Sequence, residues 1–166
     1  MDATITTEER NWAAIAHAST LASVLVGVLT GGVGSLILVL VPLAIYAAFQ
    51  QRSRYVAFQA LQALAFQLAA LIAYAMGLTA LLILTVVAWV MAALLTIVLV
   101  GVVLMPVALA VTLLLVLFGL AFPLAVMLYG LQGAVESGRG AEFRYRWIGP
   151  WLEQKGVSGW GALVDN

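Results

Sequence analysis

Two long runs without a charged residue dominate the chain. One covers residues 11–51 and the other covers residues 55–135. A helix needs about 20 apolar residues to cross the hydrocarbon core of a bilayer, so the first run has room for two spans and the second for about three. The pattern predicts an all-α fold, a polytopic transmembrane helix bundle of four to five hydrophobic helices with an interfacial C-terminal tail.

Polar and glycine-rich stretches divide the chain into four regions. They are a polar N-terminus at 1–10, a transmembrane helical hairpin at 11–50, a second helical membrane block at 51–136 with two to three spans, and a basic, Trp-rich interfacial tail at 137–166. A threonine followed by Glu8 and Glu9 is typical of a helix start. Glycines at 31–34 predict the turn of the hairpin, and Pro42 predicts a kink in a second span over 33–49.

Small residues recur at every fourth position of the first predicted helix. They are Ser19, Ser23, Gly27 and Gly31. A ridge of this kind lets the backbone of a neighbouring helix approach closely. We expect a helix-packing face here, either within the chain or against a partner.

A polar stripe follows the two arginines of the middle loop. At 100° per residue Tyr55, Gln59, Gln62 and Phe66 fall on one helix face, with Gln67 at its edge. An unpaired amide in hydrocarbon costs several kcal/mol, so these side chains need partners. Either they hydrogen-bond across the bundle, or they line a polar groove or pore.

His17 is the only histidine and lies about one and a half turns inside the first predicted helix. Ionisable residues inside a membrane are functional candidates, and a neutral imidazole can ligate haem or a chlorophyll-type pigment. The other interpretation is a single interhelical hydrogen bond. The sequence offers no second ligand, so we expect no cofactor, although haem or a chlorophyll-type pigment at His17 is not excluded.

Aromatic and basic residues gather where the chain leaves the membrane. The predicted interfacial anchors are Trp12, Arg52, Arg54, Arg144, Arg146, Trp147 and Trp151. Trp at the membrane interface and Arg on the cytoplasmic side are typical of integral membrane proteins. We therefore expect the bacterial cytoplasmic (inner) membrane, with both termini in the cytoplasm.

Three crossings between residues 55 and 135 conflict with that topology, because an odd number puts the tail on the opposite face. Three alternatives would resolve the conflict. In the first, the tail lies on the opposite face; in the second, residues 78–104 are re-entrant or strongly tilted. In the third, residues 55–67 lie along the interface and the rest of the region forms two long kinked helices.

Composition narrows the function classes. Of the 166 residues, 65% are hydrophobic and 8% charged, and the mean hydropathy is +1.15, far from the roughly one quarter of charged residues in globular domains. The chain has no cysteine and no net charge, so we expect no metal site and no nucleic-acid partner. Its acids lie outside or at the edge of the spans without a catalytic partner, so we expect no enzyme.

Four motifs carry a family resemblance. They are NWAAIAHAS, VPLAIYAAFQ before a basic turn, YVAFQALQALAFQ, and FRYRWIGPWLE near the end. Their order and spacing resemble a bacterial family of small four-helix membrane proteins of unknown function, which is similar to the twenty-kilodalton channel subunit of the chloroplast inner-envelope translocon. The resemblance implies a four-helix core with both termini on one side. That family usually has histidine where this chain has Gln59.

Three functions follow as expectations. The first is a non-catalytic accessory or structural subunit that packs against a larger membrane complex, its partners being the lipid bilayer and other membrane proteins or further copies of itself. The second, from the resemblance and the glutamine stripe, is a translocon-type channel component. The third is a membrane cofactor binder that uses His17.

Overall fold

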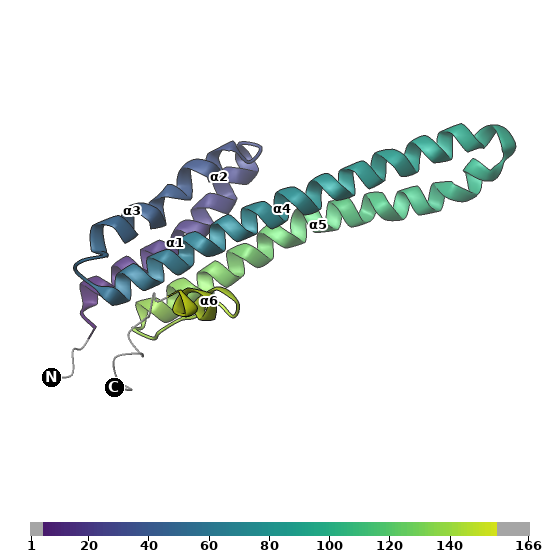
Figure 1. The fold of residues 1–166 in the computed structure, drawn as a ribbon. Helices are drawn as coiled ribbons and strands as arrows, with labels where there is room; N and C mark the ends of the chain where they lie inside the picture. The colour runs from purple at the N-terminus through teal and green to yellow at the C-terminus, as the bar shows by residue number, and fades with distance from the viewer. Residues whose placement is uncertain (1–4, 156–166) are drawn as a thin grey trace. The chain divides into compact units, whose positions relative to one another are not determined.

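The computed structural model describes residues 5–155, and the predicted all-α membrane bundle is confirmed. The helices are α1 (Thr7–Leu29), α2 (Val33–Leu38), α3 (Leu40–Phe49), α4 (Arg54–Leu95), η1 (Thr96–Val98), α5 (Val100–Gly138) and α6 (Ile148–Gln154) (Figure 1). Three of these stretches are long and apolar enough to cross a membrane, namely Thr7–Leu29, Arg54–Val98 and Val100–Gly138.

Local sequence signals explain where the first helices begin and end. The Thr6 side chain caps α1 and Glu9 completes a capping box, because the Glu9 carboxylate accepts from the Thr6 amide at 2.8 Å. Gly31 and Gly32 both have positive φ, 62° and 95°, which only glycine adopts without strain. The predicted second span is divided at Val39. Pro42 lacks the N–H that would bond the Leu38 carbonyl, and its ring clashes with that carbonyl.

The region between residues 55 and 135 contains two helices rather than three spans. Helix α4 has 42 residues and α5 has 39, so each is about 60 Å long at 1.5 Å per residue. The chain reverses at residues 96–99, where Leu99 has φ 61°, so residues 78–104 are no separate re-entrant helix. Gly77 and Gly119 do not end a helix, because one glycine costs only about 1 kcal/mol in a helix interior.

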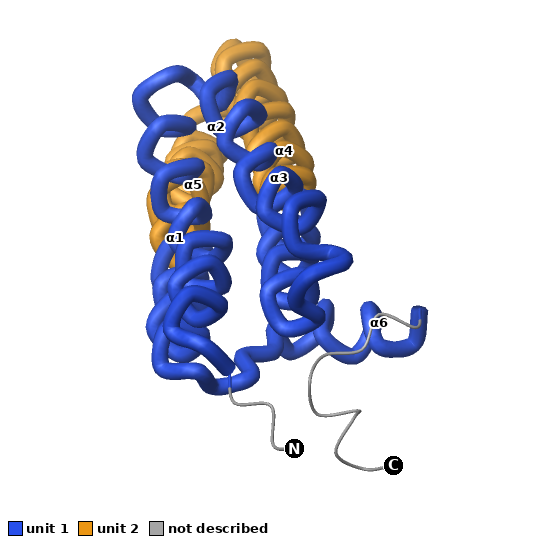
Figure 2. The backbone as a smooth tube through the Cα atoms, turned by 90° about the vertical axis from the view of Figure 1, so that its left-hand side faces the viewer, with its two compact units in different colours: residues 1–70, 126–166 blue, residues 71–125 orange. Residues whose placement is uncertain are grey.

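The chain forms two compact units (Figure 2). Unit 1 comprises Met1–Ala70 and Val126–Asn166, and unit 2 is the hairpin Leu71–Ala125. In unit 1 a core of small and aromatic side chains joins α1, α3 and α4, with Ala13, Ala16, Ala60 and Ala63 all 0% exposed. Alanine at these positions lets the helix backbones approach closely.

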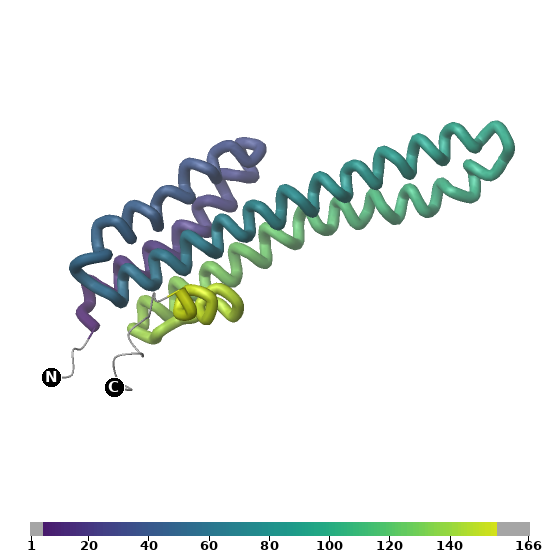
Figure 3. The backbone as a smooth tube through the Cα atoms, viewed as in Figure 1, coloured from purple at the N-terminus to yellow at the C-terminus, as the bar shows by residue number. Residues whose placement is uncertain are grey.

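Three basic segments contain all the Lys and Arg residues: the start of α1, the link from α3 to α4 with the first residue of α4, and the chain from the end of α5 to Lys155, just after α6. They lie at the same end of unit 1, here called its charged end (Figure 3). A Cβ on Gly140 would lie 2.9 Å from Arg10 Nε, and the Tyr55 hydroxyl donates to the Ala141 carbonyl at 3.1 Å. The start of α1, the link from α3 to α4 and the end of α5 therefore meet. Two helices between residues 55 and 135 remove the conflict that three predicted crossings created.

Candidate functional site

A buried polar core in unit 1 has His17 of α1 at its centre. The side chain is 0% exposed. Its Nε2 lies 2.9 Å from Gln59 Oε1 of α4, and its Nδ1 lies 3.1 Å from the Tyr145 hydroxyl. The Ser137 hydroxyl of α5 also donates to Gln59 Oε1, at 3.5 Å. Because an amide oxygen only accepts, His17 Nε2 carries the proton and Nδ1 accepts from Tyr145.

Tyr145 reaches this core from the linker between α5 and α6, residues 141–147. Its ring stacks on Phe66 with 4.2 Å between centroids and meets Tyr129 and Phe143 edge to face at 5.0 and 4.9 Å. Burial raises the pKa of the Tyr145 phenol above its ordinary range. The hydroxyl therefore stays protonated and serves as a fixed donor to His17.

The Gln62 side chain binds the backbone of the same linker. Its Nε2 donates to the Phe143 carbonyl at 3.0 Å, and its Oε1 accepts from the Tyr145 amide at 3.1 Å. One side-chain amide thus pairs with two backbone groups, as a neighbouring strand would. Tyr55, about two turns earlier, donates to the Ser137 carbonyl at 3.0 Å. These bonds fasten the chain after α5 to the first turns of α4.

A second cluster of hydrogen bonds lies farther along α4, around Gln67. Its Nε2 donates to Ser19 Oγ at 2.7 Å and to Thr20 Oγ1 at 3.2 Å, and its Oε1 accepts from Ser23 at 3.1 Å. The serines of the predicted small-residue ridge therefore face α4. All three glutamines of the stripe are at most 3% exposed.

The two glycines of that ridge have different roles. A Cβ on Gly27 would lie 3.2 Å from Ser35 Cβ, so Gly27 permits the close approach of α2. Gly31 is not part of the packing face: α1 ends at Leu29, and nothing lies within 4 Å of a Cβ at Gly31. Its role is the left-handed backbone of the turn.

Two glycines of α5 were missed from the sequence. A Cβ on Gly130 would lie 2.8 Å from Thr20 Cβ, and one on Gly133 would lie 2.9 Å from His17 Nδ1. Together they let α5 pack against the polar face of α1. The signal was their spacing of three residues near the end of the last apolar run. Ser137, 0% exposed, follows one helical turn later and was also missed.

The predicted interfacial anchors have different environments. Arg144 pairs with Glu142 at 3.1 Å and with Glu153 at 2.7 Å, so its charge is compensated within the tail. The Trp12 ring packs against Phe49 at 5.5 Å. Arg52 and Arg54 are exposed beside the start of α4. Arg146 lies over the Trp147 ring at 5.7 Å, and Trp147 and Trp151 are 80% and 53% exposed.

The core's chemistry is that of structural hydrogen bonding. In residues 5–155 no three His, Asp or Glu side chains gather as a metal site would require. Both nitrogens of His17 are occupied, so an axial bond to haem or a pigment would first break one of its two hydrogen bonds. The three stripe amides lie buried against protein, whereas a pore lining would face an open path.

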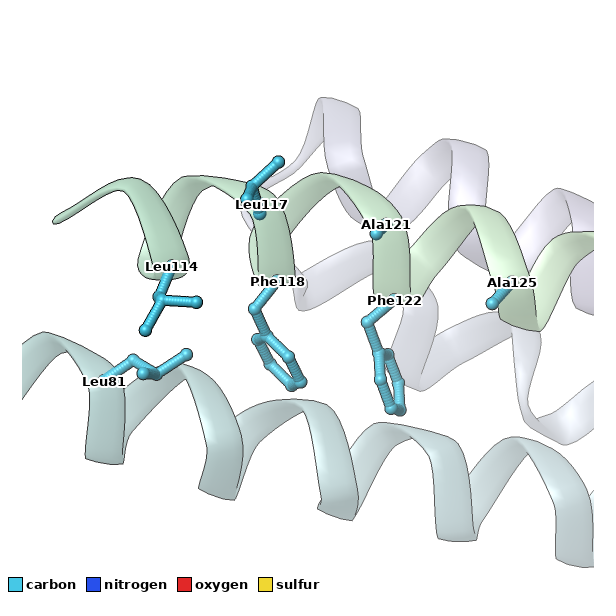
Figure 4. A pocket seen from close by; sticks show the side chains of 7 residues that line it. All are labelled: Leu81, Leu114, Leu117, Phe118, Ala121, Phe122 and Ala125. Carbon is cyan, nitrogen blue, oxygen red and sulfur yellow. The ribbon is translucent and has the colours of Figure 1, made fainter. Parts of the chain in front are cut away.

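Unit 2 offers a different kind of surface. A shallow groove of about 500 Å³ there is lined by Leu81, Leu114, Leu117, Phe118, Ala121, Phe122 and Ala125 (Figure 4). None of these side chains donates or accepts a hydrogen bond, so the groove suits hydrocarbon.

These observations define a polytopic helical membrane protein whose buried polar side chains hold its own helices together. The chain belongs to the magnetosome magnetite crystal formation protein family, whose model matches residues 8–152. No curated protein and no solved structure matches it. The predicted membership in a family of small membrane proteins is thereby confirmed, while the likeness to the chloroplast translocon subunit receives no support from the comparisons. The family favours a membrane-associated structural or accessory protein.

Proposed function

We propose that this chain is a structural component of the membrane in which magnetite crystals form. In this role it packs against other membrane proteins and performs no chemistry of its own. The observation that carries the proposal is the polar core: His17, Gln62 and Gln67 bond partners within unit 1, so none of them is left to bind a substrate. The family match over residues 8–152 connects this architecture with magnetite crystal formation.

The distribution of charge supports an indirect role. All seven Lys and Arg residues, and all seven acids, lie outside the two turns at residues 30–32 and 96–99. Cations favour the cytoplasmic side of a membrane, so we assign the charged end of unit 1 to the cytoplasm. Within residues 5–155, neither the turn at 30–32 nor the turn at 96–99 carries a carboxylate, so neither turn offers an acidic oxygen ligand to iron ions. Contact with the growing mineral therefore falls to partner proteins.

The large apolar surface supports membrane partners. Ile97, Val103 and Leu94 of unit 2 are 89%, 73% and 62% exposed, and hydrocarbon or an apolar protein surface is the medium that suits them. The channel alternative has no comparable support, because its proposed lining side chains are bonded within unit 1.

Deletion and complementation in a magnetosome-forming bacterium test the proposal. We expect deletion to change the number, size or shape of the magnetite crystals seen by electron microscopy, and the wild-type chain to restore them. Mild extraction of a tagged chain from magnetosome membranes should co-purify the same membrane proteins in repeated preparations. Unchanged crystals after deletion, together with a partnerless monodisperse protein, would overturn the proposal.

The matched variants separate structure from chemistry. Gly133→Ala perturbs the polar core without removing any polar group, and Gly119→Ala changes the same helix where nothing lies within 4 Å of the new Cβ. We expect only the first to impair complementation. If Gly133→Ala destabilises the protein yet the crystals are fully restored, the intact core is not what the function requires.

A further inference from the structure

We infer that the outward face of α6 binds the anionic headgroups of the membrane that holds the bundle. Helix α6 lies at the charged end of unit 1 and runs across the direction of α1 and α3, as both views show (Figures 1 and 2). A short helix that lies across a bundle at its polar end is placed as interfacial helices are, in the plane of the headgroups. The inference is independent of the proposed function.

The rotation of α6 about its own axis is set by contacts on its inner side. Gly149 and Leu152 are buried, and a Cβ on Gly149 would lie 3.3 Å from Gln62 Oε1. The Gly149 amide donates to the Tyr145 carbonyl at 2.9 Å. With this side held against the bundle, Trp147 just before the helix and Trp151 within it point outward, at 80% and 53% exposure. Two exposed indoles on one face are the usual signature of a membrane interface.

The charges on this face select the kind of lipid. Arg144 is compensated by Glu142 and Glu153. Arg146 and Lys155 are exposed at the two ends of α6 and form no ion pair with another described residue. Arg146 also lies against Trp147, so one cation and one indole form a joint surface. A pair of cations that flank two indoles is complementary to phosphate groups at the headgroup level, and anionic lipids attract such cations most.

A single environment-sensitive label tests the inference in the full chain. The chain has no cysteine, so Gln154→Cys, on the exposed side of α6, accepts one fluorophore. The labelled protein is placed in nanodiscs of neutral phosphatidylcholine, or of the same lipid with one third phosphatidylglycerol. The probe is quenched with acrylamide, a neutral quencher that neither lipid repels. We expect acrylamide quenching to be about twofold weaker in the anionic discs.

Charge variants identify the residues responsible. Arg146→Gln combined with Lys155→Gln should remove the difference between the two lipids. Arg52→Gln combined with Arg54→Gln changes the net charge equally at the same end of unit 1 and should leave the difference intact. If the first pair fails to fold, 0.5 M salt with the unchanged charges replaces it, because screening at that ionic strength should also abolish the difference.

Each remaining outcome counts against the inference. Equal quenching in neutral and anionic discs overturns the preference for anionic lipid. Quenching as strong as that of the unfolded, labelled chain in both discs shows that this face touches no membrane at all. An equal loss with both variant pairs assigns the effect to net charge and removes α6 as the binding surface.

Discussion

Residues 54–70 and residues 71–95 belong to one helix, α4, but the first stretch carries three buried glutamines and the second carries none. In unit 1 each of these glutamines has a hydrogen-bond partner outside α4. In unit 2 the inter-helix hydrogen bonds are those of Tyr74 to the Gly119 carbonyl at 3.3 Å and of Trp89 to Thr112 at 2.9 Å, the latter exposed. The same helix is thus specified by polar contacts in one half and by aliphatic shape in the other.

The difference between the two halves of α4 reflects the lipid that surrounds membrane helices. Lipid tails are as apolar as leucine, so aliphatic contacts between membrane helices do not favour one register strongly over another, whereas small residues and hydrogen bonds do. Unit 1 has both, in the serines, glycines and amides around His17 and Gln67. Unit 2 has close contacts at Gly77, where a Cβ would lie 2.5 Å from Phe118, and at Gly101, where a Cβ would meet the Ala92 carbonyl beside the turn. We therefore expect stability to depend on polar and small residues in unit 1 and to be tolerant of substitution in unit 2.

Among these substitutions, His17→Ala is expected to cause the largest loss of stability. The change opens a cavity, leaves the Tyr145 hydroxyl without its acceptor and leaves Gln59 Oε1 with only the 3.5 Å bond from Ser137. It should lower the free energy of unfolding by about 3 kcal/mol. Unfolding by SDS in mixed micelles measures it. Leu94→Ala in unit 2, where the side chain is 62% exposed, is the matched control, with a change under about 0.5 kcal/mol. Equal effects of the two substitutions would erase the contrast between the units.

Two glycines of one helix give the next test. Gly133→Ala in unit 1 forces a methyl group against His17 and should cost about 1–3 kcal/mol. Gly119→Ala in unit 2 meets open space and should stabilise the helix by about 0.5–1 kcal/mol. The same micelle titration compares them. Opposite signs support the comparison, and a stabilising Gly133→Ala contradicts the close packing at His17.

The raised pKa of Tyr145 predicts a loss of stability in alkali. Above pH of about 10 the unfolded phenol ionises while the folded phenol keeps its proton, so stability falls by up to about 1.4 kcal/mol per pH unit. Below that pH neither state ionises and Tyr145 adds no pH dependence. Unfolding measured between pH 8 and 11 should show a weaker alkaline decline in Tyr145→Phe. An identical decline in both proteins would mean that Tyr145 ionises normally.

The smallest loss of stability is expected when Gln67 is replaced. Its replacement by leucine leaves the hydroxyls of Ser19, Thr20 and Ser23 to bond their own helix, so the loss should be about 1 kcal/mol, within the range for membrane hydrogen bonds. Thr112→Val, which removes the exposed bond to Trp89 in unit 2, should cost less. A larger loss for Thr112→Val would reverse the assignment of polar specificity to unit 1.

Several features of the fold follow from sequence alone. The start of α1 at the Thr6 cap, its end near Leu29 and the end of α5 at Gly138 follow from caps and glycines, which act within a few residues. The division of the second span at Val39 follows from Pro42, and Val39 itself keeps helical dihedral angles, φ −59° and ψ −24°, as a kink would require. The count of helices between residues 55 and 135 could not be predicted, because an uninterrupted aliphatic run contains no polar signal for its turn.

The polar core of unit 1 could likewise be predicted only in part. Periodicity placed Tyr55, Gln59 and Gln62 on one face, and the cost of an unpaired amide required partners for them. Periodicity could not identify those partners. His17 lies 42 residues from Gln59, and Phe143 and Tyr145 lie more than eighty residues from Gln62 in a linker without regular structure. The contact of Gly133 with His17 could not be predicted either, because a glycine in a membrane helix does not indicate which side chain packs against it.

The sequence by itself determined that the chain is a helical membrane protein, where its charges lie, and which polar side chains need partners. Each of these follows from hydrophobic length, charge and desolvation, which are properties of single segments. Only the tertiary structure decided that the linker inserts Tyr145 against His17, that the three basic segments share one end of unit 1, and that Arg144 is compensated while Arg146 is exposed. Those outcomes depend on contacts between distant residues, and apolar helices have no local pattern that selects among the possible pairings.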